Sequence, residues 1–322
     1  MKQSRPAFDP ELRRLARVLP RGVASSRTLH LVRPLEWLAA HRPPPPDVAV
    51  EAAGSVTVRV HRPPAGGNGP MPAILWVHGG GYVFGLAAQD DPLCRGLAQQ
   101  LGAVVAAVEY RKAPEHPFPA ALDDCHEALV WLASSPEVDP ARVAVAGASA
   151  GGGLAAALAI EARSRGEVRP VFQSLLYPML DDRTTLRPDI DERGFRLWNN
   201  ESNRFGWRSY LGTEPGFPGI TSPASPARET DLSGLPDAWI GVGTLDLFLQ
   251  EDLEYAERLR DAGVGCEVEV AEGAFHAFDG LVPGAAVSRR FRASQVAALA
   301  RAFGTNTDPS NQTGDGVTAR HV

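Results

Sequence analysis

The chain has 322 residues, of which 44% are hydrophobic and 22% are charged, and its formal net charge is −6. This composition is ordinary for a soluble globular protein, and the length suits one large domain or two small ones. No stretch combines clustered Lys and Arg with interleaved aromatic residues, so the sequence argues against a nucleic-acid partner.

The first elements predicted along the chain are short helices in residues 1–45, which end in a proline run at 43–46. An alternating strand follows at 55–61. Beyond it, apolar runs alternate with helical segments, as is typical of a parallel sheet covered on both faces. Strands are expected at 74–77, 104–110, 143–146, 171–177, 239–242 and 267–271, and helices at 92–101, 120–133, 150–163, 251–262 and 285–303. The predicted fold class is α/β, with a mostly parallel central sheet.

Two segments interrupt this alternation. Residues 181–235 form a long insertion rich in Arg, Trp, Asn and Pro, and a connection of that length is usually functional, often as a lid. We therefore expect residues 46–303 to form the main domain, with the insertion and the helices of 1–45 as a helical cap. The polar, turn-rich residues 304–322 are expected to form a disordered tail.

Location follows from the N-terminus and the cysteines. The N-terminus has no apolar region of the kind found in signal peptides, and the three cysteines are far apart. Free thiols fit a reducing cytoplasm, so we expect a cytoplasmic protein without a disulfide framework or a zinc site. Residues 143–160 are uncharged but too rich in Ala and Gly to cross a membrane, so no membrane span is predicted.

The strongest chemical signal is Gly147-Ala148-Ser149-Ala150-Gly151, between an apolar strand and an Ala-rich helix. A serine hydroxyl is a weak nucleophile that must be exposed and held at one angle, which a sharp strand-to-helix turn achieves when its neighbours are small. The alternative is a glycine-rich turn with an incidental serine. Residues 151–156 also fit a dinucleotide-binding fingerprint, but they lie inside the predicted helix and no acidic partner follows the next strand.

A second signal, His78-Gly79-Gly80-Gly81, directly follows the strand at 74–77. Ester cleavage builds negative charge on the carbonyl oxygen, and preorganised backbone N–H groups stabilise that charge. Gly80, Gly81 and Ala150 are therefore the expected donors of an oxyanion hole. A flexible loop between strand and helix is the alternative.

A nucleophilic serine also needs a base and an acid, which follow it along the chain in the order acid, then histidine. Of the eight histidines, only His276 and His321 leave room for an acid after Ser149, and His321 lies in the predicted tail. His276 is therefore the expected base. Asp246 follows a strand at the sheet edge where ligand sites of parallel sheets lie, and is the expected acid.

Other titratable residues have simpler explanations. The rival acids Glu251, Asp252 and Asp237 are expected to be solvated carboxylates near a helix start or a strand start. The stretch 123–127, Asp-Asp-Cys-His-Glu, holds residue types that bind metals, but its spacing matches no ligand pattern. We expect it to be the first turn of a helix.

At this point the chain resembles the bacterial hormone-sensitive-lipase-like esterases, which carry an HGGG oxyanion motif. The resemblance covers roughly residues 40–303 and rests on HGGGYVFG, YRKAPEHPFPAALDD, GASAGGG, LLYPMLDD, GVGTLDLF with Glu251 five residues after Asp246, and GAFHAF. The sequence departs from the family pattern in three places. Many members have Asp at the position of Ala148, DPLRDE where DLFLQE ends at Glu251, and HGF where this chain has HAF.

The resemblance implies an α/β-hydrolase fold, the triad Ser149, Asp246 and His276, and the oxyanion donors named above. It implies that His78 shapes the glycine loop without transferring protons, and that residues 110–119 form a structural segment in which Arg111 and Glu115 could pair. It further implies short- to medium-chain acyl esters as substrates.

The sequence therefore predicts a serine carboxylesterase acting on a small-molecule ester, without cofactor or metal; a homodimer is compatible with it. Candidate pocket residues are Tyr82, Phe84, Leu197, Trp198 and Phe248, and core packing is the alternative for each. Two other functions stay open. The same fold serves as a small-molecule receptor when the catalytic histidine is lost, and the triad alone does not distinguish esters from amides or lactones.

Overall fold

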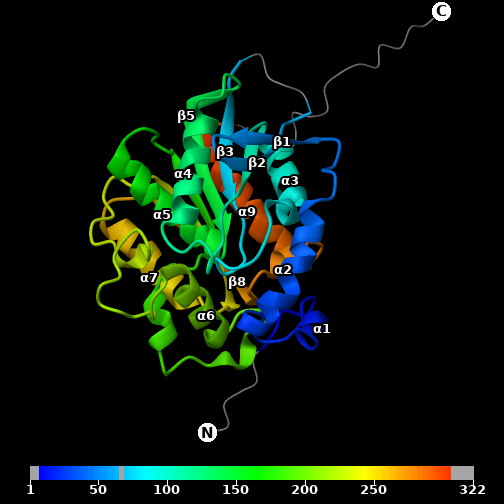
Figure 1. Ribbon diagram of the computed structural model, residues 1–322, viewed down its shortest axis with the longest axis vertical. Helices are drawn as coiled ribbons and strands as arrows, with labels where there is room; N and C mark the ends of the chain where they lie inside the picture. Colours follow the sequence, from blue (N-terminus) through cyan, green and yellow to red (C-terminus); the bar gives the residue numbers. More distant parts are fainter. Residues whose placement is uncertain (1–6, 65–68, 306–322) are drawn as a thin grey trace, which may run out of the picture.

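The computed structural model describes residues 7–64 and 69–305. Within these residues, eight strands form one sheet in the order β1-β2-β4-β3-β5-β6-β7-β8 (Figure 1). The strands are β1 (Val48–Ala53), β2 (Val56–His61), β3 (Met71–Val77), β4 (Val104–Glu109), β5 (Val138–Ala148), β6 (Phe172–Leu176), β7 (Asp237–Leu245) and β8 (Cys266–Phe275). Only β1–β2 and β2–β4 pair antiparallel. The expected mostly parallel α/β-hydrolase sheet is confirmed.

Helices cover both faces of this sheet, because successive side chains of a strand point to opposite faces. Leu75 and Val77 of β3 belong to one core with side chains of α4, α5 and α7. Ile74 and Trp76, which alternate with them, belong to a second core with side chains of α3 and α9. The large helices are α3 (Asp91–Leu101), α4 (Ala120–Ala133), α5 (Ala150–Arg165), α7 (Leu249–Asp261) and α9 (Ala286–Phe303).

The remaining elements lie near the ends of the strands. The N-terminal segment holds α1 (Arg13–Ala16) and α2 (Ser26–Ala40); η1 (Ala87–Asp90) precedes α3, and α8 (Phe278–Leu281) precedes α9. The insertion at 181–235 contains η2 (Asp182–Leu186), η3 (Glu192–Gly194), α6 (Asn200–Leu211) and η4 (Pro226–Arg228). Most of the tail expected at 304–322 lies outside the described residues, as does His321.

The N-terminal segment and the insertion contact each other directly, although about 180 residues separate them. The backbone N–H of Leu197 donates to the carbonyl of Pro20 at 2.8 Å. The hydroxyl of Ser202 accepts from the N–H groups of Val23 and Ala24, each at 3.1 Å. In the described ranges, no helix combines the length and the hydropathy needed to cross a membrane.

Candidate active site

The turn at Ser149 joins β5 to α5 with little room around it. Ser149 adopts φ 58° and ψ −122°, an uncommon conformation for a residue with a side chain. A Cβ at Gly147 would lie 2.3 Å from the carbonyl oxygen of Gly151, and a Cβ at Gly151 would lie 2.1 Å from that of Val77. Only glycine at these two positions lets the helix start against the sheet, and this fixes the direction of the Ser149 side chain.

The ends of three strands bring Ser149, His276 and Asp246 together. The His276 Nε2 lies 2.9 Å from the Ser149 Oγ, and the His276 Nδ1 lies 2.8 Å from the Asp246 Oδ2. The other Asp246 oxygen accepts from the N–H of Phe248 at 3.1 Å. The three residues are buried, with exposed fractions of 7%, 5% and 3% in the order named. This arrangement can carry a proton from the serine hydroxyl to an imidazole oriented by a carboxylate.

The glycine loop lies beside the nucleophile. Gly80 and Gly81 have φ of 129° and 58°, and a Cβ at Gly81 would lie 2.1 Å from the Trp198 ring. Among the described residues, no acceptor receives the N–H of Gly80 or Gly81. Ala150 is the first residue of α5, where an N–H has no partner within its helix. These three donors are therefore free to bind an anionic oxygen.

The imidazole of His78 packs against the glycine loop that follows it. Its Nδ1 lies 2.8 Å from the Gly79 carbonyl oxygen, and its ring stacks on Tyr110 with centroids 4.3 Å apart. Complete burial lowers the pKa of His78 to about 4, so the ring is neutral near pH 7. These contacts are structural, and His78 is not among the residues that line the cavity described next.

Ser149 and His276 open into a cavity of about 410 Å³. Three of the five candidate pocket residues, Phe84, Leu197 and Trp198, lie on its wall. Tyr82 and Phe248 do not, and here the pocket prediction is wrong. Tyr82 stacks on Tyr210 with centroids 4.0 Å apart, and Phe248 is fully buried with its ring 5.4 Å from that of His276. Core packing is the better description of both.

One end of the cavity is polar. The Trp76 indole donates to the Asp90 carboxylate at 2.8 Å, and burial raises the pKa of Asp90 to about 6. The Tyr177 hydroxyl donates to Asp279 at 2.8 Å, and Asp279 pairs with Arg292 at 3.0 Å. Sequence reasoning missed these residues because acids at the start of a helix look like ordinary solvated side chains.

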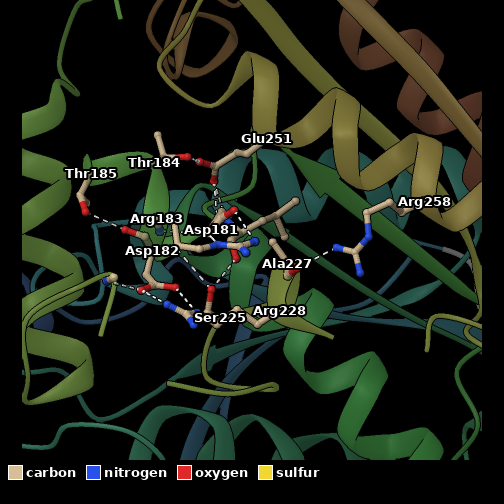
Figure 2. A network of polar contacts seen from close by, with 12 residues as sticks. Asp181, Asp182, Arg183, Thr184, Thr185, Ser225, Ala227, Arg228, Glu251 and Arg258 are labelled. Carbon is tan, nitrogen blue, oxygen red and sulfur yellow. Dashed lines mark hydrogen bonds and ion pairs between the residues drawn. The ribbon is translucent and has the colours of Figure 1, made fainter. Parts of the chain in front are cut away.

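Glu251 and Asp252 contradict the expectation of solvated carboxylates, since only 5% and 0% of them are exposed. Glu251 accepts from the N–H of Leu180 at 2.7 Å and that of Asp181 at 3.1 Å, and from the Thr184 hydroxyl (Figure 2). Burial raises the pKa of Glu251 well above its ordinary value. The carboxyl five residues after Asp246 therefore fastens α7 to the start of the insertion.

Figure 2 also shows how the insertion is held to itself. Asp182 is fully buried and pairs with Arg228 at 2.7 Å, while its backbone N–H donates to the Ser225 hydroxyl at 3.3 Å. Ser225 joins the two carboxylates, because its hydroxyl donates to the carbonyl of Leu180 at 3.1 Å, and the N–H of Leu180 donates to Glu251. The two buried carboxylates thus organise one network at the base of the insertion.

The expected pair of Arg111 and Glu115 is also wrong. Arg111 pairs with the buried Asp124 at 2.6 Å, and Glu115 pairs with Arg33 of α2. The stretch 123–127 is helical, as expected, but it lies mainly in the second turn of α4 and not in the first, and its side chains take separate partners: Glu127, for example, accepts from the Ser55 N–H at 2.9 Å. In the part of the chain that the structure describes, no three His, Cys, Asp or Glu side chains gather as a metal site would require.

The chain is similar in sequence and structure to known α/β-hydrolases and esterases. A family model described as the alpha/beta hydrolase fold matches residues 74–280. Esterase LipI of Mycobacterium tuberculosis is 33% identical, with 87% of this chain and 92% of that protein covered. The structure named Bacterial Heroin Esterase is 36% identical with a TM-score of 0.83, covering 94% of this chain and 99% of that one. The gibberellin receptor GID1C of Arabidopsis thaliana is 33% identical, covering 67% and 69%.

Proposed function

The chain belongs to the α/β-hydrolase family, in its hormone-sensitive-lipase-like branch, and from that membership we propose that it is a carboxylesterase with Ser149 as its nucleophile. The observation that carries the proposal is the series of hydrogen bonds from Ser149 through His276 to Asp246. Beside it lie the backbone N–H groups of Gly80 and Gly81, for which the described residues offer no acceptor. The names of LipI and of the heroin esterase support the ester as substrate class.

The mechanism follows from these contacts. Ser149 Oγ attacks the ester carbonyl while the His276 Nε2 accepts its proton, and Asp246 stabilises the imidazolium through Nδ1. The carbonyl oxygen becomes anionic and accepts hydrogen bonds from Gly80, Gly81 and Ala150. The alcohol leaves with the proton from His276. Water, deprotonated by the same imidazole, then attacks the acyl-enzyme and restores Ser149.

The shape of the site supports short- to medium-chain acyl groups. The cavity of about 410 Å³ is at the small end of the range found for small-molecule sites. Val23 comes from the N-terminal segment, and Leu197 and Trp198 come from the insertion, and all three lie on the cavity wall. Residues 7–45 of the N-terminal segment and residues 181–235 therefore act together as a cap that limits the length of acyl chain admitted.

The test compares wild type with Ser149→Ala on p-nitrophenyl acetate, butyrate, octanoate and palmitate. Turnover that peaks at the shorter chains and is lost in the variant supports the proposal. The control is Ser209→Ala, whose hydroxyl only donates to the Phe205 carbonyl on α6 and should leave turnover unchanged. Equal turnover in wild type and Ser149→Ala contradicts the nucleophile.

A receptor function is the second candidate, since one relative is named a gibberellin receptor. The contact between His276 and Ser149 at 2.9 Å favours catalysis, because a binding protein needs no such base. Absence of turnover on all four esters, together with saturable binding of a small molecule in the cavity, would favour the receptor.

A further inference from the structure

The outer face of α2 is unusually apolar for a surface helix. Leu31, Leu35 and Leu38 recur at the spacing of one helix face and are 71%, 68% and 54% exposed. Trp37, which lies about 100° around the helix from Leu38 and so at the edge of the leucine face, is 64% exposed. We name these four residues the α2 apolar face. Large side chains clustered in this way on a soluble protein usually mark a surface that another body covers.

The segment that carries this face is basic. Residues 1–45 contain nine Lys and Arg against three Asp and Glu, a net +6, whereas the whole chain carries −6 and the remainder therefore −12. Arg27 lies one turn before Leu31 on the same face of α2, and Arg42 lies two residues after the end of the helix, so arginines flank the leucines along the chain. Both are exposed, and neither forms an ion pair with a carboxylate of the described residues.

We infer that the α2 apolar face is the docking surface for an anionic lipid bilayer, with the helix axis parallel to the membrane plane. A helix with leucines on one face, a tryptophan at the edge of that face and arginines near its two ends binds in this way, by inserting its apolar side chains while the cations meet lipid phosphates. A symmetric contact with a second copy would bring the same arginines together, which like-charge repulsion disfavours.

The inner side of α2 connects this face to the glycine loop. Arg33 donates to the carbonyl of Val83 at 3.0 Å and to that of Ala113 at 2.6 Å. Glu36 accepts from the N–H of Gly85 at 2.5 Å. These contacts hold α2 against the segment that follows Gly81 and contains Phe84 of the cavity wall. A bilayer bound to α2 therefore lies next to the cap of the cavity and can deliver esters dissolved in lipid.

This second consequence rests on the proposed esterase function, whereas the docking itself does not. The experiment therefore measures binding first, by sedimentation of the full chain with vesicles of phosphatidylcholine alone or with about 30% phosphatidylglycerol. Wild type should bind the anionic vesicles at least tenfold more tightly than the neutral ones, and added salt should weaken that binding. Ser149→Ala should bind like wild type, so a failure of the catalytic proposal would leave this result intact.

The decisive variant is the triple change Leu31→Gln, Leu35→Gln and Leu38→Gln. Its matched control, Leu186→Gln with Leu253→Gln, changes leucines that are 55% and 39% exposed outside the N-terminal segment. The triple variant should lose at least tenfold in vesicle affinity while the control keeps it, with thermal midpoints close to wild type in both. Arg27→Gln with Arg42→Gln should weaken binding to anionic vesicles and reduce its salt dependence.

A catalytic readout tests the delivery step. The ratio of hydrolysis of a vesicle-dissolved ester to that of a water-soluble ester should fall about tenfold in the triple variant, in parallel with binding. Equal vesicle affinity in wild type, triple variant and control would overturn the inference. So would a wild-type dimer, detected by light scattering, that the triple variant converts to monomer, because a second copy would then be the occupant.

Discussion

Replacing Asp90 by Asn should change how stability depends on pH. Asp90 lies at the polar end of the cavity, where burial raises its pKa from 3.8 to about 6 although the Trp76 indole donates to it at 2.8 Å. Asn is neutral at every pH and keeps a side-chain oxygen that can accept from Trp76. The substitution therefore removes the cost of ionising a buried carboxyl and preserves the hydrogen bond.

The sign follows from proton linkage. Because the folded-state pKa of Asp90 is above the unfolded one, the folded protein binds more protons between about pH 4 and pH 6, and stability falls as pH rises through that window. A difference of two pKa units corresponds to about 3 kcal/mol, and partial access to water reduces this to about 1–3 kcal/mol. Asp90→Asn should match wild type near pH 4 and exceed its unfolding free energy by that amount near pH 8.

Urea unfolding of both proteins between about pH 4 and 8 measures this difference. His78, whose pKa burial lowers to about 4, makes both proteins less stable as pH falls, and this contribution cancels in the comparison. The control is Asp139→Asn, because the hydrogen bond from Arg142 lowers the pKa of Asp139 in the folded state, so that above about pH 5 this carboxyl is ionised in both the folded and the unfolded protein. Its difference from wild type should stay constant above about pH 5, and a constant difference for Asp90→Asn over the same range would refute the reasoning.

Three further substitutions test the site and its support. Gly81→Ala should lower kcat by roughly 10²-fold, because the new Cβ would meet the Trp198 ring at 2.1 Å and displace an oxyanion donor. Burst-phase kinetics measures this loss. Gly151→Ala should lower the unfolding free energy by about 2–3 kcal/mol, because its Cβ would meet a backbone oxygen of β3; urea titration checks this. Glu251→Ala should cost about 2–4 kcal/mol in the same titration by leaving buried N–H groups unpaired, whereas the exposed Glu254→Ala should change stability by less than about 0.5 kcal/mol.

Much of the fold could be predicted because its signals are local. Most of the parallel strands are short apolar runs, and most are followed by a helix, so sheet class and element order follow from the chain. The proximity of Ser149, Asp246 and His276 could also be predicted, because the carboxyl ends of parallel strands meet at one edge of the sheet. The edge strand β1 was missed, since VAVEAA at 48–53 alternates only weakly.

Burial of polar residues was not predictable in the same way. Glu251 looks like a helix-start acid, and it becomes a buried acceptor only because it meets the N–H groups of Leu180 and Asp181, which lie 71 and 70 positions earlier. Two acids, Glu115 and Asp124, lie close to Arg111 along the chain, and the packing of α4 places Asp124 against it. Such choices depend on which segments fold over a residue, and a local pattern carries no information about that.

The cap shows why this limit matters for function. Trp198 of the insertion packs against Gly81 and leaves no room there for a Cβ. The N–H of Leu197 donates a hydrogen bond to the carbonyl of Pro20 in the N-terminal segment. Arg33 of α2 binds the same loop from its other side, at Val83. The oxyanion loop is thus enclosed by two segments that are distant in sequence. Because oxyanion stabilisation depends on donor positions held to a fraction of an ångström, changes in either cap segment should alter kcat as well as substrate binding.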